Sequence, residues 1–192
     1  MSPVTPFASA LASRAQLLHD QFHLQHETDP QLAAQIRQFW QDVGEAFPGV
    51  STPWSAVFVS SCVKHAGATP AEFQFSPEHS VFVHRAIANA EANTGVFRGR
   101  RITEYAPQVG DVIQNNRLGH QFDFDFARTH VDYPSHSAIV VSRGADANGE
   151  FCTTIGGNEG DSIRMKNIRL SDHGFIQQRP VSPFICIIQD LK

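Results

Sequence analysis

The chain has 192 residues, 41% of them hydrophobic, and this length and composition predict one domain with a substantial core. Its formal net charge is −4 and its basic residues are scattered, which excludes the basic surface of a typical nucleic-acid-binding protein. The three cysteines are widely spaced in apolar stretches, so we expect buried thiols and neither a disulfide framework nor a zinc site.

The N-terminal segment and the hydropathy of the chain bear on its location. Residues 1–22 lack the basic start and the uninterrupted apolar stretch of a secretory signal. No segment approaches the ~20 apolar residues of a membrane span. We therefore expect a protein that is cytoplasmic as made, with no membrane span, and that reaches the periplasm or the extracellular space only by a route that reads no such signal.

The first half of the chain predicts four helices. Apolar residues recur at helical spacing over residues 8–26. Asp29 and Pro30 then supply an N-cap and a first-turn proline for a second helix, which ends at Gly44.

A third predicted helix, residues 54–67, is apolar around most of its circumference, which is typical of a buried helix. We expect the core to hold its first residues, Trp54 and Ser55. A fourth helix should follow, with Ser76 as its N-cap and Pro77 at its first position.

The second half of the chain predicts strands. Four short segments are rich in β-branched residues and bounded by Gly, Asp, Asn or Pro, namely residues 110–114, 136–143, 150–157 and 183–189. A polar turn between the second and third of these predicts a hairpin. Helices followed by strands indicate an α+β fold with a small antiparallel sheet, in which residues 1–50 form a helical part and residues 51–192 a core with a cleft.

A long loop joins the first two predicted strands and is expected to be functional or mobile. Within it, Phe and Asp alternate in "QFDFDFAR", which predicts a strand with a solvated acidic face and a buried Phe face. The loop also supplies the side chains of an alternative hypothesis, a metal-dependent hydrolase that binds zinc or calcium through His120, Asp123, Asp125, His130, Asp132 and His136. Their spacing matches no compact metal motif, and the main prediction includes no metal and no cofactor.

Three polar residues lie at predicted element ends, where side chains can meet in a cleft. Ser55 starts the buried helix, His136 starts a strand and Asn158 follows the next strand. An imidazole can take a nucleophile's proton while a third group fixes its tautomer. Free N–H groups at the helix start favour a developing oxyanion. These residues are therefore the predicted catalytic nucleophile, base and orienting residue.

The order of the motifs resembles the NlpC/P60 and CHAP superfamily of papain-like hydrolases, and within it the bacterial DUF2272 family. The resemblance covers roughly residues 30 to 168 and rests on "RQFWQDVG", "PWSAVFVSSCVKHAG", "SPEHSVFV", "GDVI", "HSAIVV" and "IGGNEGDSI". It implies a papain-like fold and cleavage of amide bonds in bacterial cell-wall peptides by a triad of cysteine, histidine and a polar residue. That pattern falls on Ser55, His136 and Asn158.

Serine stands where the superfamily usually has cysteine, and a serine hydroxyl must lose its proton during attack. Three explanations stay open: a working Ser-His hydrolase, a non-catalytic binding domain, and an engineered replacement of cysteine. Acyl transfer on the same scaffold is a further option.

Neighbouring side chains are candidates for substrate binding. Trp54 adjoins the nucleophile position. His79 lies in the first turn of the fourth helix and either lines the site or caps the helix, and Asp161 either reaches His136 or the substrate or forms an Asx-type turn.

The sequence therefore predicts a peptidoglycan amidase or endopeptidase with a Ser-His-Asn triad. A bacterial antibacterial effector is one setting for such an enzyme, and its partners would be the peptidoglycan peptide and an immunity or delivery protein, with no nucleic acid. The alternatives are a peptidoglycan- or peptide-binding module and the metal-dependent hydrolase.

Overall fold

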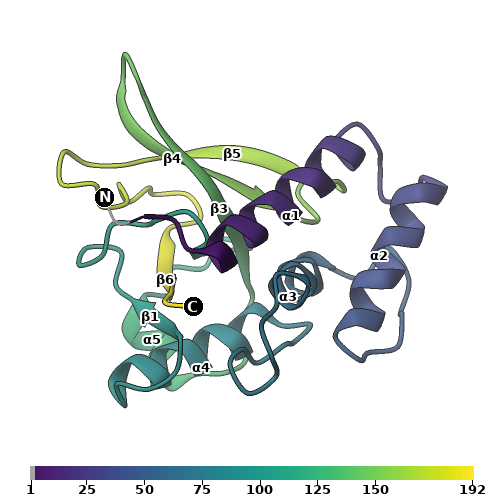
Figure 1. Ribbon diagram of the computed structural model, residues 1–192, viewed down its shortest axis with the longest axis horizontal. Helices are drawn as coiled ribbons and strands as arrows, with labels where there is room; N and C mark the ends of the chain where they lie inside the picture. Colours follow the sequence, from purple (N-terminus) through teal and green to yellow (C-terminus); the bar gives the residue numbers. More distant parts are fainter. Residues whose placement is uncertain (1–2) are drawn as a thin grey trace.

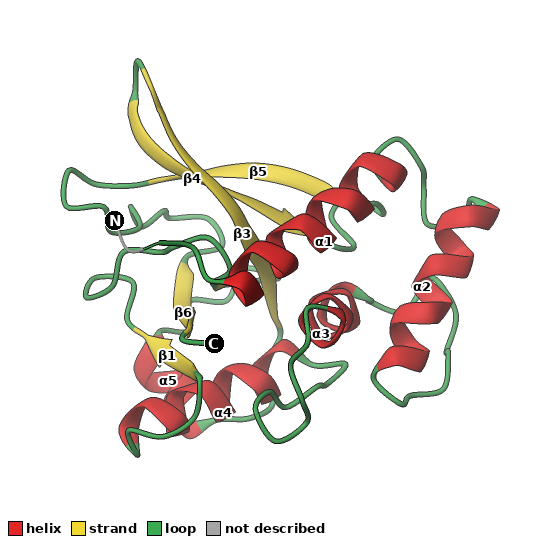
Figure 2. Ribbon diagram, in the orientation of Figure 1, coloured by secondary structure: helices red, strands yellow, loops and turns green. Residues whose placement is uncertain are grey.

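The computed structural model describes residues 3–192 and confirms the α+β prediction (Figures 1 and 2). Its helices are α1 (Pro6–Phe22), α2 (Pro30–Asp42), α3 (Ser55–His65), α4 (His79–Glu91) and α5 (Phe124–Thr129). Its strands are β1 (Phe97–Arg100), β2 (Val112–Asn116), β3 (Ser135–Asp146), β4 (Gly149–Gly156), β5 (Arg164–Arg169) and β6 (Phe184–Asp190). No helix within residues 3–192 is long and apolar enough to cross a membrane.

The six strands form one antiparallel sheet in the order β1-β6-β2-β3-β4-β5. The predicted hairpin joins β3 to β4, with Asp146 opposite Gly149 at its tip. The sequence did not predict β1, which has only four residues, or β5, which is mostly exposed and polar. Strands that bury few apolar side chains carry little of the alternation by which strands are found.

The two faces of the sheet bury different side chains, because successive residues of a strand point to opposite sides. Val112, Ile139, Ile155 and Ile188 belong to the main core with the helices. Residues that point the other way belong to a second, smaller core on the opposite face, namely Ile113, Val140, Cys152 and Ile187. Cys62, Cys152 and Cys186 are free and buried, which confirms the prediction of buried thiols.

Helix α3 is the centre of the main core, as its all-round apolar sequence predicts. It lies between α1, α2 and α4 in Figure 1, and every residue from Ser55 to Val63 is buried. Phe58 contacts Phe39 of α2 edge to face, with ring centroids 5.6 Å apart. The first turn of α3 is therefore held in place by the core.

Helix α4 begins later than predicted. Its first residue is His79 and its N-cap is Glu78, so the prediction of an N-cap at Ser76 was wrong. Ser76 Oγ instead accepts a hydrogen bond from the backbone N–H of Glu78 at 3.0 Å and forms a turn before the helix. The shift makes His79 the first helical residue, where its side chain can reach the start of α3.

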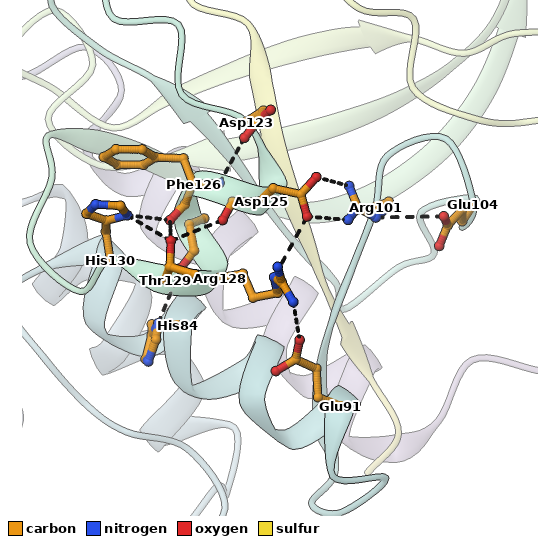
Figure 3. A network of polar contacts seen from close by, with 11 residues as sticks. His84, Glu91, Arg101, Glu104, Asp123, Asp125, Phe126, Arg128, Thr129 and His130 are labelled. Carbon is orange, nitrogen blue, oxygen red and sulfur yellow. Dashed lines mark hydrogen bonds and ion pairs between the residues drawn. The ribbon is translucent and has the colours of Figure 1, made fainter.

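The segment predicted as a strand with an acidic face is the helix α5. Asp123 caps it by accepting a hydrogen bond from Phe126 N at 2.8 Å. Phe122, Phe126 and His130 stack four residues apart, with centroid distances of 4.1 and 3.9 Å. The alternation of aromatic and acidic residues concealed this helical spacing. Figure 3 shows Asp125 on the opposite side, paired with Arg101 and Arg128.

The end of β4 lies directly against the first turn of α3. A Cβ atom on Gly157 would lie 2.7 Å from Phe58 Cβ and 2.7 Å from Trp54 Cζ3, closer than such atoms approach. Glycine at this position therefore lets the strand end and the helix start come together. That contact brings the loop after β4 to Ser55.

Gly157→Ala should lower the free energy of unfolding by about 1–3 kcal/mol, because the added methyl overpacks a rigid contact. The matched control is Gly144→Ala in the hairpin, where the three atoms nearest to the added Cβ belong to the ring of half-buried Phe151, which can move aside. Urea denaturation of both variants measures the difference. A Gly157→Ala protein no less stable than Gly144→Ala would contradict the packing described for β4 and α3.

Candidate active site

Ser55 and His79 are in direct side-chain contact at the candidate site. Ser55 is the first residue of α3 and His79 the first of α4, and Ser55 Oγ lies 2.7 Å from His79 Nε2. Both side chains are buried, with relative exposures of 2% and 6%. The structure thus pairs the predicted nucleophile with the histidine that the sequence assigned to substrate binding.

The surroundings of His79 keep its imidazole neutral. Burial, followed by the nearby charges of His136 and Arg117, holds the pKa of His79 well below its usual range. Its Nδ1 is buried and has no hydrogen-bond partner among residues 3–192. A neutral imidazole at hydrogen-bond distance can accept a proton from Ser55, but no carboxylate on Nδ1 stabilises the imidazolium that would form.

His136 has the carboxylate that His79 lacks. Its Nε2 lies 2.8 Å from Glu159 Oε1, and Lys166 forms an ion pair with the other oxygen of the same carboxylate. Burial opposes ionisation of Glu159, but the hydrogen bond and charge of His136 and the ion pair with Lys166 outweigh it, so the pKa of Glu159 lies below its usual range. Glu159 is therefore ionised and can orient the His136 ring.

The turn after β4 presents Glu159 to His136. Asn158, Gly160 and Asp161 all have positive φ angles, between 55° and 57°, which makes this turn tight. A Cβ atom on Gly156 would lie 2.2 Å from Glu159 Oε1 and 2.9 Å from His136 Nε2. Only glycine at this position leaves room for the pair.

The two pairs meet through their histidines. The rings of His79 and His136 lie edge to face with centroids 5.4 Å apart. Within residues 3–192, the Ser55 side chain is hydrogen-bonded to His79, and the His136 side chain is hydrogen-bonded to Glu159. Among these residues Ser55 and His136 therefore do not form the direct hydrogen bond that the sequence predicted. The site is a row of four residues: Ser55, His79, His136 and Glu159.

Asn158 does not orient His136 as the sequence predicted. Its Nδ2 donates a hydrogen bond of 3.0 Å to Glu27 Oε2 in the α1–α2 loop, and Trp54 Nε1 donates one of 2.9 Å to the same oxygen. Asn158 and Trp54 thus hold the turn after β4 and the start of α3 together through Glu27. Trp54 is fully buried and lines neither of the cavities at the site.

Asp161 also faces the α1–α2 loop. Its carboxylate lies 3.4 Å from His26 Nε2, and its backbone carbonyl accepts a hydrogen bond from Glu27 N. The structure does not bring Asp161 to Ser55 or His136. Of the three residues predicted to bind substrate, His79 is the one whose side chain is hydrogen-bonded to Ser55 within residues 3–192.

Two cavities adjoin the row. One, of about 490 Å³, is lined by Ser55, His79, Tyr133 and Arg117 among others. The other, of about 610 Å³, is lined by His136, Glu159 and Arg117 among others. The first gives a ligand access to Ser55 at a helix start, where the first backbone N–H groups lack helical partners and can hold a negatively charged oxygen.

Sequence reasoning missed Glu159 and Glu27. Glu159 directly follows Asn158, the residue predicted to orient His136. The "GGNEGD" turn could have indicated Glu159, because any polar side chain in this turn could face His136. Glu27 gave no signal, because its partners Trp54 and Asn158 are distant in sequence.

The residues of the metal hypothesis serve separate purposes. Asp123 caps α5, Asp125 pairs with Arg101, and His130 stacks on Phe126 (Figure 3). Within residues 3–192, no three His, Cys, Asp or Glu residues converge as metal ligands. No observation in this loop favours the metal-dependent hydrolase.

The buried His79 makes stability depend on pH. The unfolded chain protonates His79 below its usual pKa near 6.5, whereas the folded chain keeps it neutral, so the unfolded state binds more protons and stability falls as pH drops below about 6.5. Between pH 7.5 and 5.5, wild type should lose about 1 kcal/mol more than His79→Gln. The exposed His173→Gln should behave as wild type in urea denaturation. Equal losses in His79→Gln and wild type would contradict a neutral His79.

Comparison with known proteins gives a family. The sequence profile of the family described as "Uncharacterized protein conserved in bacteria (DUF2272)" matches residues 19–184, a range that contains all four residues of the row. No curated protein and no solved structure matches the chain. Because the profile covers most of the chain and the site lies within it, the protein belongs to the DUF2272 family.

Proposed function

We propose that the protein hydrolyses amide bonds in bacterial cell-wall peptides, with Ser55 as the nucleophile and His79 as the base. One observation carries the reaction: the 2.7 Å contact between Ser55 Oγ and the neutral His79 at the start of a buried helix. A nucleophile in hydrogen-bond contact with an unprotonated base, beside free backbone N–H groups, is the arrangement that acyl transfer requires.

The first half of the reaction forms an ester on Ser55. Ser55 Oγ attacks the carbonyl carbon of the amide while its proton passes to His79 Nε2. The N–H groups of the first turn of α3 hold the oxyanion of the tetrahedral intermediate. His79 then gives the proton to the leaving nitrogen as the carbon–nitrogen bond breaks.

Water completes the reaction. His79 takes a proton from a water molecule that attacks the ester, and it returns a proton to Ser55 Oγ as the carboxylic acid product leaves. His136 is oriented by Glu159 and packs edge to face with His79, which fixes the position of the His79 ring. His136 and Glu159 are therefore positioning residues in this proposal.

The substrate class comes from the resemblance of the motif order to NlpC/P60 and CHAP hydrolases. Supporting features are the bacterial family, the helix that starts at the nucleophile position, and a histidine on the strand β3. The serine in place of the usual cysteine is accommodated by the direct contact with His79, since a serine needs a base within reach. Delivery to the cell wall by a partner protein belongs to the same proposal.

A second candidate is a peptide-binding module without turnover. It is favoured by the buried Nδ1 of His79, which has no partner within residues 3–192, because an imidazolium there would be poorly stabilised. This candidate keeps the cavity at Ser55 as a binding site.

The hydrolase proposal is tested by incubating purified peptidoglycan with the protein and separating the released fragments by chromatography with mass detection. Ser55→Ala should reduce fragment release at least ~10³-fold, and His79→Gln ~10²–10⁴-fold, as loss of a nucleophile or a base does. His136→Gln should cost less than His79→Gln, because His136 acts through position alone.

The controls are Ser13→Ala, an exposed serine of α1, and His173→Gln, an exposed histidine, and both should release fragments as wild type does. Fragment patterns that are the same for wild type and Ser55→Ala would remove the hydrolase proposal. Binding of intact peptidoglycan without release, unchanged in Ser55→Cys, would establish the second candidate. A larger loss in His136→Gln than in His79→Gln would transfer the role of base to His136.

A further inference from the structure

The larger cavity beside the candidate site has an excess of positive charge in a chain whose net charge is −4. Arg117, Lys166 and Arg179 line it, and its only lining carboxylate within the described residues is Glu159. That carboxylate is already engaged by His136 and Lys166. Within this cavity the two arginines therefore have no second carboxylate to pair with, although the Ser55 cavity, which Arg117 also lines, includes Glu78 and Asp132.

Arg179 is held in place by its own surroundings. Its Nε donates a hydrogen bond of 2.9 Å to the Ser182 carbonyl, and its guanidinium lies over the Phe184 ring, 4.3 Å from the centroid. Burial lowers the pKa of Arg179, while the charge of Glu159 raises it. Its two terminal nitrogens donate no hydrogen bond to the protein within residues 3–192. They form a fixed and partly desolvated pair of donors that a ligand can use.

Arg117 lies where the two cavities meet. It lines both the cavity at Ser55 and the cavity at His136, and its guanidinium forms no hydrogen bond or ion pair within residues 3–192. An arginine without a partner at this junction can contact a ligand that extends from Ser55 toward Arg179. Its charge also acts on His79, which places it near the reacting groups.

We propose that the cavity lined by Arg117 and Arg179 binds a carboxylate of the substrate, so that the preferred substrates are acidic peptides. A guanidinium matches a carboxylate through two parallel hydrogen bonds, and such bonds are stronger than neutral ones. The position of the cavity, next to His136 and joined to the Ser55 cavity at Arg117, places the carboxylate a short distance along the substrate from the bond at Ser55. The inference rests on the proposed function for the identity of the amide bond that is cut at Ser55. The binding of the carboxylate itself does not depend on that function.

Binding is measured apart from hydrolysis, by calorimetry on the Ser55→Ala protein with N-acetyl-alanyl-glutamate and with its fully amidated analogue as probes. The carboxylate peptide should bind at least ~10-fold more tightly than the amide, since charge-assisted bonds to arginine are lost in the amide. Arg117→Gln and Arg179→Gln, each in the Ser55→Ala background, should each weaken binding of the carboxylate peptide ~5-fold or more. Added salt should weaken it further.

The matched control is Arg85→Gln, which removes an exposed arginine of α4 that lines neither cavity and should leave binding unchanged. Arg179→Lys keeps the charge but not the fork of donors, and should bind the carboxylate peptide less tightly than the Ser55→Ala protein that retains Arg179. Thermal denaturation confirms that each variant is folded.

Equal affinity for the carboxylate peptide and its amide, or affinity unaffected by Arg117→Gln and Arg179→Gln, would overturn the inference. Inorganic phosphate that competes with the carboxylate peptide would support it, because both anions need the same donors. If phosphate binds to the protein but neither peptide binds, the assignment of the site to a carboxylate is overturned. Carboxylate binding without peptidoglycan cleavage would leave the anion site standing and remove the hydrolase proposal alone.

Discussion

The start of α3 is packed between the main core and the end of β4, and the candidate site depends on that contact. Gly157 allows the close approach, and Glu27 ties the two segments together through Trp54 and Asn158. The packing fixes Ser55 at a helix start and the "GGNEGD" turn beside it. Because each of these residues is held by rigid elements, the row of polar side chains is set before any ligand binds.

The placement of Ser55 and His136 followed from sequence because each lies at the end of a strongly patterned element. An all-round apolar segment marks a buried helix, and β-branched runs mark the central strands. The partners of these residues were harder to predict. Whether Asn158 or Glu159 faces His136 depends on a left-handed turn, and whether His79 reaches Ser55 depends on where α4 begins. The contacts that result join residues more than twenty positions apart, and no local pattern in the sequence encodes them.

The arrangement differs from a simple triad in the way its charges are shared. The carboxylate of Glu159 supports His136, whereas the imidazole in contact with Ser55 is that of His79, which is neutral and buried and has no carboxylate partner among residues 3–192. A serine nucleophile needs a base in direct contact, and in our proposal His79 is that base. The positively charged cavity at Arg117 and Arg179 adjoins this row, and in our proposal it selects substrates that carry a carboxylate.

The central claim is that His79 activates Ser55, and covalent labelling tests it most directly. An alkyl fluorophosphonate forms an oxygen–phosphorus bond with a serine whose proton a neighbouring base removes, with loss of fluoride. Mass spectrometry of the digested protein should find the label on the peptide that contains Ser55 in wild type, and little or none in His79→Gln. A wild-type protein that stays unlabelled at Ser55, or a His79→Gln protein labelled as fast as wild type, would contradict the account.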